Sequence, residues 1–263
     1  MGITFIGMGS RSSGQVRGYQ LISNVRKYNF YDKIGFDIID RPVAELHKLQ
    51  KSNPSISEID WNALCSDYVD FYIVTNSIAK LHMTKVTNKK VYVIPHHVVS
   101  EKLIKKDVEA RPKIVGYLGT KDQLMERDKI IEFCKNNNLE FYENHPRDRE
   151  ECIKDLKKID IGIVYLDRNS RTEYVMKFKP NQKLSNFQCF GIPSIITGYE
   201  SYKEFGGTDA YILVDDAKGL EQSLTTLLNN KKVRTDIQKN GYDASERLLL
   251  NNVIDIYTTI EKQ

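Results

Sequence analysis

The sequence predicts an α/β protein built from two Rossmann-like, doubly wound domains, of which the N-terminal one is shortened. Short apolar runs alternate with amphipathic segments along the whole 263-residue chain, which is typical of parallel sheets covered by helices. A charged, weakly patterned stretch at about 100–112 interrupts this alternation and is interpreted as a linker. The length suits two small domains, which we place at 1–105 and 106–263.

In the first half, short apolar runs predict strands, and apolar residues three or four positions apart predict helices. The expected strands are Ile3–Gly7, Lys33–Ile39, Phe71–Val74 and Val91–Ile94. The expected helices are Val16–Tyr28, Val43–Lys51, Ser57–Cys65 and Ser77–Thr84. This order predicts a parallel sheet with covering helices.

The second half repeats the same kind of alternation. Its expected strands are Ile114–Leu118, Leu139–Tyr142, Ile161–Tyr165, Pro193–Thr197 and Ala210–Val214. Its expected helices are Asp122–Asn136, Arg149–Lys157, Gln182–Cys189, Ser201–Phe205, Lys218–Leu228 and a segment from Lys232 onward. A long polar loop, Asp167–Pro180, precedes the third of these helices.

Composition narrows the class of protein. No apolar run is long enough to cross a bilayer, and the N-terminus lacks the pattern of a secretory signal. The four cysteines are widely spaced without a CxxC or Cys/His pattern, which favours free thiols in a reducing cytoplasm. A net charge of +4 permits a phosphate-rich ligand, a nucleic acid or peripheral membrane contact, and requires none of them.

Four segments of the second half occur in the order found in the C-terminal domain of GT-B glycosyltransferases. They are KIVGYLGTK at 113–121, IDIGIVYL at 159–166, KPNQKLSNFQCFGIPSII at 179–196 and VRTDIQKNGYDASER at 233–247. The chain thus resembles glycosyltransferase family 4, also called group 1. In the first half the resemblance is thinner and rests on QVRGYQL at 15–21 and VIPHHV at 93–98.

The resemblance implies two domains facing a cleft, with a last helix that crosses back to the first domain. It also implies transfer of a sugar from a nucleoside-diphosphate sugar to an acceptor hydroxyl, with retention of configuration. No cofactor beyond the sugar nucleotide is expected. Because the chain has no Asp-x-Asp motif of the metal-dependent type, we expect no obligatory metal.

Three residues are candidates for catalysis. Lys183 lies near the start of a predicted helix, where unpaired N–H groups favour anions, and the resemblance identifies it as the diphosphate lysine. Lys121 would supply a second cation at the turn after the strand Ile114–Leu118. Glu173 is the only carboxylate in the central part of the polar loop and could contact sugar hydroxyls. Solvated side chains and an exposed loop are the structural alternatives.

The donor-binding candidates lie in both halves. The loop Gly7–Gly14 partly matches a dinucleotide fingerprint, and His97 follows a strand at the domain junction, where packing at a hinge is the alternative. Arg17 lies on an amphipathic helix, so a solvated face is its alternative. The full set is Gly119, Thr120, Asn181, Asn186, Tyr174, Gly9, Arg17 and His97.

Two positions depart from the family pattern. Asn186 stands where the family has a ribose-binding glutamate, and Phe178, eight positions earlier, also replaces a glutamate. A divergent active enzyme and a non-catalytic module that binds sugar nucleotides or glycans therefore both stay open. An NAD-dependent oxidoreductase is a third reading. The short first domain would suit a large acceptor, such as a glycan, a lipid-linked glycan, a protein or DNA.

Overall fold

The computed structural model describes residues 3–6, 33–37, 71–166, 180–198 and 200–261. They fall into two compact units, which we describe separately. Unit 1 contains the described residues up to His97, the single residue Pro180 and the described residues from Asn251 onward. Unit 2 contains all other described residues between Val98 and Leu250. The sequence places a domain boundary between residues 105 and 106, whereas the two units separate between His97 and Val98.

Unit 1 is built on a parallel sheet. Its four strands, β1 (Ile3–Ile6), β2 (Lys33–Asp37), β3 (Phe71–Val74) and β4 (Lys90–Val93), lie side by side in chain order. Helix α5 (Ser77–Val86) connects β3 to β4. Its N-cap residue is Asn76, whose side chain accepts a hydrogen bond from the Ala79 N–H at 2.8 Å. The predicted parallel sheet is thereby confirmed.

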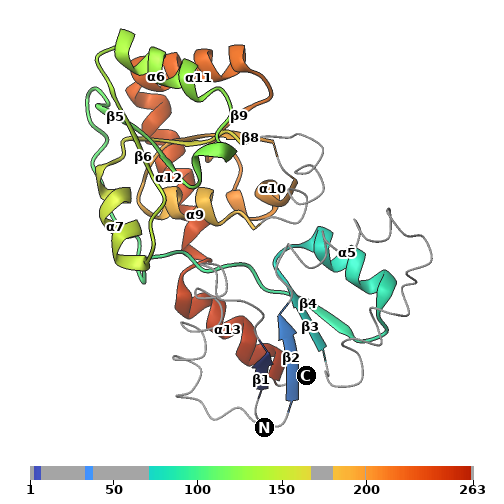
Figure 1. Cartoon of the computed structure of the whole chain (residues 1–263). Helices are drawn as coiled ribbons and strands as arrows, with labels where there is room; N and C mark the ends of the chain where they lie inside the picture. Colours follow the sequence, from blue (N-terminus) through green and yellow to red (C-terminus); the bar gives the residue numbers. More distant parts are fainter. Residues whose placement is uncertain (1–2, 7–32, 38–70, 167–179, 199, 262–263) are drawn as a thin grey trace, which may run out of the picture. The chain divides into compact units, whose positions relative to one another are not determined.

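The C-terminal helix α13 (Leu250–Glu261) packs against the sheet of unit 1, where it contacts β3 (Figure 1). The residues buried together are Phe71, Ile73, Ile94, Val253 and Tyr257. Burying such apolar side chains from two distant segments is the main favourable contribution to folding. The end of the chain therefore belongs to the core of unit 1, as the resemblance implied.

Unit 2 is built on a five-stranded parallel sheet in the order β6-β5-β7-β8-β9. The strands are β5 (Ile114–Leu118), β6 (Glu140–Asn144), β7 (Ile161–Val164), β8 (Ser194–Thr197) and β9 (Ile212–Val214). All residues of β7 and β8 are buried, which explains why these strands are continuous apolar runs. The strand order reverses at β5 and β7, and this reversal is the switch point of a doubly wound sheet.

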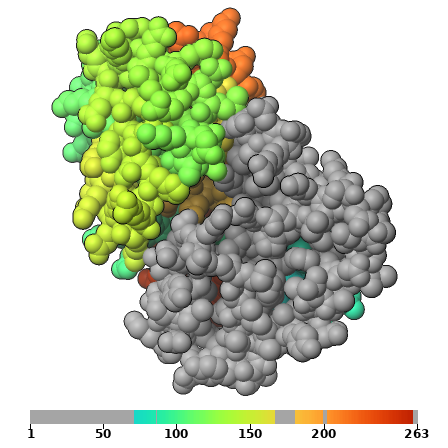
Figure 2. Space-filling view, in the orientation of Figure 1, coloured from blue at the N-terminus to red at the C-terminus, as the bar shows by residue number. Residues whose placement is uncertain are grey.

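Helices cover both faces of this sheet. They are α6 (Arg127–Asn136), α7 (Arg149–Lys158), α9 (Gln182–Cys189), α10 (Glu200–Gly206), α11 (Ala217–Asn229) and α12 (Lys231–Glu246). Figure 1 shows α6 and α11 on one face and α7 and α9 on the other, as right-handed crossovers require. In Figure 2, α6, α7 and the segments between them form much of the visible coloured surface of unit 2. None of the helices described here is long and apolar enough to span a membrane.

The predicted helix Asp122–Asn136 is wrong in its first turn. Residues Lys121–Gln123 form a 3₁₀ turn, and Leu124 then pairs with Leu166 in an isolated antiparallel bridge. Glu126 has a left-handed backbone with φ of 53°, which interrupts the helix, so α6 begins at Arg127. Apolar periodicity cannot reveal this bridge, because its partner residue, Leu166, lies far along the chain.

The stretch predicted as a linker is bound along unit 2. We call residues 98–112 the linker segment. The Val99 N–H donates to Asn186 Oδ1 at 2.8 Å, and the Lys106 N–H donates to the Tyr242 hydroxyl at 3.0 Å. These partners lie 87 and 136 positions later in the chain, on α9 and α12. Local composition therefore could not predict that this polar segment is held in place.

Candidate functional site

The candidate site lies where β5, β7 and α9 of unit 2 converge. Parallel α/β sheets bind ligands outside the carboxyl ends of their strands, at the switch point. Here β5 ends at Leu118 and continues into the turn Gly119–Lys121. The chain that leaves β7 returns to the sheet through α9, which begins at Gln182. Topology therefore places the predicted glycine turn and the predicted lysine helix on the same edge of the sheet.

Lys183 reaches from α9 to the turn after β5. Its Nζ donates a hydrogen bond to the Tyr117 hydroxyl at 3.1 Å and lies 4.6 Å from the centroid of the Tyr117 ring. A Cβ atom at residue 119 would collide with Lys183 Nζ and lie 2.6 Å from Tyr117 Oη. A side chain at residue 119 would therefore displace the Lys183 ammonium or the Tyr117 hydroxyl, and two of the four segments that carry the resemblance meet here.

The turn Gly119–Lys121 has few hydrogen-bond donors available for a ligand. The Gly119 N–H donates to the Asn144 carbonyl at 2.8 Å, so this amide is already used. Thr120 Oγ1 is buried and has no hydrogen-bond partner within the described ranges. The Lys121 side chain is 75% exposed, and its Nζ lies 3.9 Å from Glu143 Oε2, which makes a weak surface pair. The turn can therefore offer the Thr120 hydroxyl and the Lys121 ammonium to a ligand.

The N-terminus of α9 has no side-chain cap from its N-cap residue. Asn181 occupies its N-cap position but makes no capping hydrogen bond through its side chain. By contrast, Asn76 and Asn230 accept amide hydrogens of their own helices, α5 and α12. Asn181 is 2% exposed, and its Nδ2 has no partner in the part of the chain that the structure describes. First-turn N–H groups together with this unused amide can bind an anion.

Asn186 binds the backbone of the linker segment. Its Oδ1 accepts the Val99 N–H, and Arg149 Nε donates to the Val99 carbonyl at 2.7 Å. The acceptor half of the amide is therefore used within unit 2, and Nδ2 is the half left for a ribose hydroxyl. The residue that departs from the family pattern thus has a structural contact in this chain.

Replacing Asn186 with alanine is expected to expose the Val99 amide to exchange. Losing one such hydrogen bond lowers the free energy of local opening at the Val99 amide by about 0.5–1.5 kcal/mol. This loss corresponds to roughly 2- to 10-fold faster hydrogen exchange at that amide. Asn186→Asp keeps an acceptor oxygen and should preserve the protection. Equal exchange rates at Val99 in the wild type and the alanine variant would show that this bond does not hold the linker segment.

The other predicted site residues are placed as follows. His97 is buried in unit 1, with 3% of its surface exposed. Outside the described residues lie Gly9, Arg17, Glu173, Tyr174, Phe178 and the loop 7–14. The structure therefore brings Lys183 and Gly119 together and places Asn181 at the N-cap of α9, two residues before Lys183, while the roles of all these residues stay predictions.

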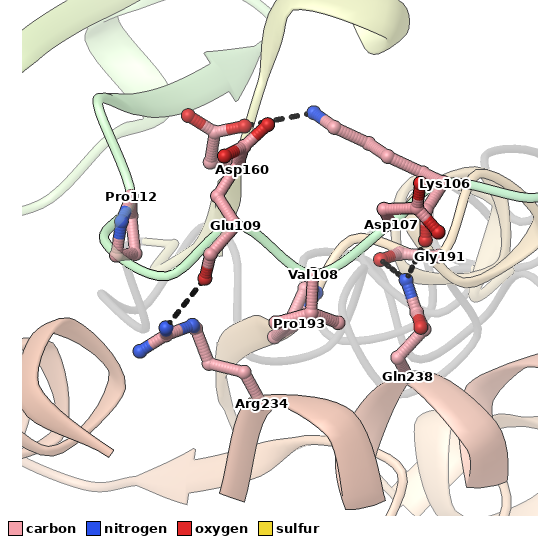
Figure 3. Close-up of a pocket in the computed structure, with 10 residues that line it drawn as sticks. All are labelled: Lys106, Asp107, Val108, Glu109, Pro112, Asp160, Gly191, Pro193, Arg234 and Gln238. Atoms are coloured by element: carbon pink, nitrogen blue, oxygen red, sulfur yellow. Dashed lines mark hydrogen bonds and ion pairs between the residues drawn. The ribbon is translucent and has the colours of Figure 1, made fainter. Parts of the chain in front are cut away.

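A crevice in unit 2 lies at the opposite edge of the sheet (Figure 3). It is lined by Lys106, Asp107, Val108, Glu109, Pro112, Asp160, Gly191, Pro193, Arg234 and Gln238. Pro112, Asp160 and Pro193 come just before β5, β7 and β8, so the crevice lies at the amino ends of these strands. Ligands of doubly wound sheets bind at the other ends, and we therefore assign the crevice to the packing of the linker segment. Among the residues that the structure describes, no group of His, Cys, Asp and Glu could hold a metal ion.

Several solved structures resemble this chain in fold. Sucrose-phosphate synthase from Thermosynechococcus elongatus is 14% identical, with a TM-score of 0.55 over 95% of this chain and 71% of its own. A UDP-forming trehalose-phosphate synthase from Burkholderia xenovorans is 12% identical, with a TM-score of 0.60 over 98% and 72%. Anabaena HepE in complex with UDP-glucose is 10% identical, with a TM-score of 0.55 over 99% and 79%.

These similarities establish the fold. No protein-family model and no curated protein sequence matches the chain. The matched structures are GT-B glycosyltransferases, so the GT-B fold that the sequence resemblance predicted is confirmed.

Proposed function

We propose that this chain is a glycosyltransferase that moves a sugar from a UDP-sugar to an acceptor hydroxyl. The observation that carries the proposal is the position of Lys183 Nζ over Gly119, at the switch point of a parallel sheet. Asn181 makes no side-chain cap at the N-terminus of α9, and its Nδ2 has no partner among the described residues, which supports an anionic ligand at this place. A uridine nucleotide is favoured because HepE is in complex with UDP-glucose and the trehalose-phosphate synthase is UDP-forming.

The proposed reaction breaks the bond between the anomeric carbon and a β-phosphate oxygen. A new bond forms from the acceptor oxygen to the anomeric carbon, and the proton of the acceptor hydroxyl passes to an oxygen of the departing UDP diphosphate. Negative charge then accumulates on the UDP diphosphate, and positioned cations and N–H dipoles lower the barrier by stabilising it. Lys183, Lys121 and the first turn of α9 would do this without a metal. From the resemblance, we further propose retention of configuration, with Glu173 and Tyr174 near the sugar.

We propose the class of acceptor from the size of the first domain. Its short length suits a large acceptor, such as a glycan, a lipid-linked glycan, a protein or DNA. Gly9, Arg17 and His97 are proposed as contacts of the donor. We also infer that the protein works in a reducing compartment, such as the cytoplasm. The described cysteines, Cys134, Cys152 and Cys189, are free thiols, which supports this inference.

Calorimetric titration with UDP-, GDP- and ADP-glucose and with NAD tests the proposal. UDP-glucose is expected to bind, and free UDP should accumulate when an extract containing acceptors is added. Binding of NAD together with no binding of any sugar nucleotide would overturn the proposal in favour of an oxidoreductase. Binding of UDP-glucose with no release of UDP would instead identify a non-catalytic sugar-nucleotide module.

A further inference from the structure

Tyr117 connects the lysine of the site to the glycine turn. It lies on β5 and is 0% exposed. Its hydroxyl donates to the Thr120 carbonyl at 3.0 Å and accepts a hydrogen bond from Lys183 Nζ. A phenol carries one proton, so donating it to Thr120 leaves the oxygen lone pairs for the lysine. The hydroxyl therefore holds Lys183 in a defined direction relative to the turn.

We propose that Tyr117 is a positioning residue, which holds the Lys183 ammonium ready for the donor diphosphate. This inference rests on the proposed function. A lysine side chain has many rotamers, and ordering it when the ligand binds would cost part of the binding free energy. The hydroxyl and the ring face of Tyr117 order it beforehand, the ring through a cation–π contact. Gly119 leaves the space that this arrangement needs.

The Tyr117 hydroxyl also brings no negative charge to the Lys183 ammonium. Burial, together with the nearby carboxylates of Asp122 and Glu143, raises the pKa of the Tyr117 hydroxyl well above its ordinary value. Tyr117 is therefore a neutral phenol at physiological pH and brings no negative charge to Lys183. A phenolate would form an ion pair with the ammonium and compete with the phosphate. A neutral phenol orients the cation without placing a negative charge beside it.

A second pair in unit 2 provides a matched comparison. Lys158 Nζ lies 4.6 Å from the centroid of the Tyr142 ring and donates to the Tyr142 hydroxyl at 2.9 Å. Here the lysine also forms an ion pair with Asp155 at 3.1 Å. The two pairs have similar geometry, but Lys158 lies on α7, away from the N-terminus of α9. Tyr142 is therefore the control position for Tyr117.

The test is the affinity of the Tyr117→Phe variant for UDP and for uridine, measured by calorimetry. The substitution keeps the buried ring and removes the hydroxyl, so UDP binding should weaken about 3- to 10-fold. Uridine carries no phosphate, and its affinity should stay unchanged. Tyr142→Phe should leave both affinities unchanged. Equal UDP affinity in the wild type and Tyr117→Phe overturns the inference alone, whereas absence of UDP binding in the wild type overturns the proposed function.

A second measurement separates positioning from a general structural effect. The rate at which acetic anhydride modifies Lys183, followed by mass spectrometry without ligand, reports how firmly the amine is held. In Tyr117→Phe this rate should rise about 3- to 10-fold, because one hydrogen bond is lost. Lys121 should react at its wild-type rate. An unchanged rate at Lys183 would show that Tyr117 does not hold this lysine, and would overturn the inference even if UDP affinity fell.

Discussion

Replacing Lys183 with methionine is expected to weaken the binding of UDP about 10- to 100-fold. Methionine keeps much of the length of the lysine stem and removes the ammonium. A hydrogen bond to a charged group contributes about 1.5–3 kcal/mol, and this range corresponds to the expected loss of affinity. The effect on turnover should be at least as large, because charge on the diphosphate grows as the glycosyl bond breaks. Calorimetry with UDP measures the first effect, and UDP release measures the second.

Lys158→Met is the matched control for this prediction. Lys158 also lies over a tyrosine ring in unit 2, but it is on α7. This variant therefore removes one ammonium group at a position away from α9. The UDP affinity of Lys158→Met should equal that of the wild type. If Lys183→Met bound UDP as tightly as the wild type, the assignment of Lys183 to the diphosphate would be wrong.

Replacing Arg234 with leucine is expected to produce the largest loss of stability. Its side chain is 2% exposed and donates to four backbone carbonyls. Two belong to Leu227 and Leu228 in the last turn of α11, and two belong to Glu109 and Ala110 in the linker segment. Figure 3 shows this guanidinium pointing to the linker segment. Leucine would leave these buried carbonyls without a donor, which costs about 3–5 kcal/mol in the free energy of unfolding.

Urea-induced unfolding followed by circular dichroism measures this loss. Arg111→Leu is the control, because Arg111 is exposed and its side chain donates only to the Asn137 carbonyl among the bonds described. Its effect should stay below about 1 kcal/mol. Arg234→Lys should be intermediate, since an ammonium keeps the charge but cannot reproduce the planar set of donors. A stability of Arg234→Leu within about 1 kcal/mol of the wild type would contradict the account.

The elements with the clearest local signals were predictable from sequence. The predicted bounds of Phe71–Val74, Ile114–Leu118 and Gln182–Cys189 match the structure. The first two are compact apolar runs that become fully or largely buried strands. The helix is bounded by Pro180 before it and by Gly191 after it, and Gly191 has φ of 63°.

Features that depend on distant partners were not predictable. The amide of Gly119 is occupied because the register of β5 and β6 pairs Leu118 with Asn144, and no local pattern shows this pairing. The same reason applies to the linker segment, whose polar composition concealed its partners on α9 and α12. The contact between Lys183 and Gly119 could be anticipated from the topology of a doubly wound sheet. The role of Tyr117 could not, although a tyrosine two residues before the glycine on an otherwise aliphatic strand was the available signal.

The central claim is that the donor diphosphate binds at the N-terminus of α9, within reach of Lys183. A crystal structure of the full chain with UDP tests this claim most directly. We expect diphosphate oxygens within hydrogen-bond distance of Lys183 Nζ and of the first amides of α9. Diphosphate density at the crevice around Arg234, or elsewhere on the molecule with Lys183 still uncontacted, would contradict it.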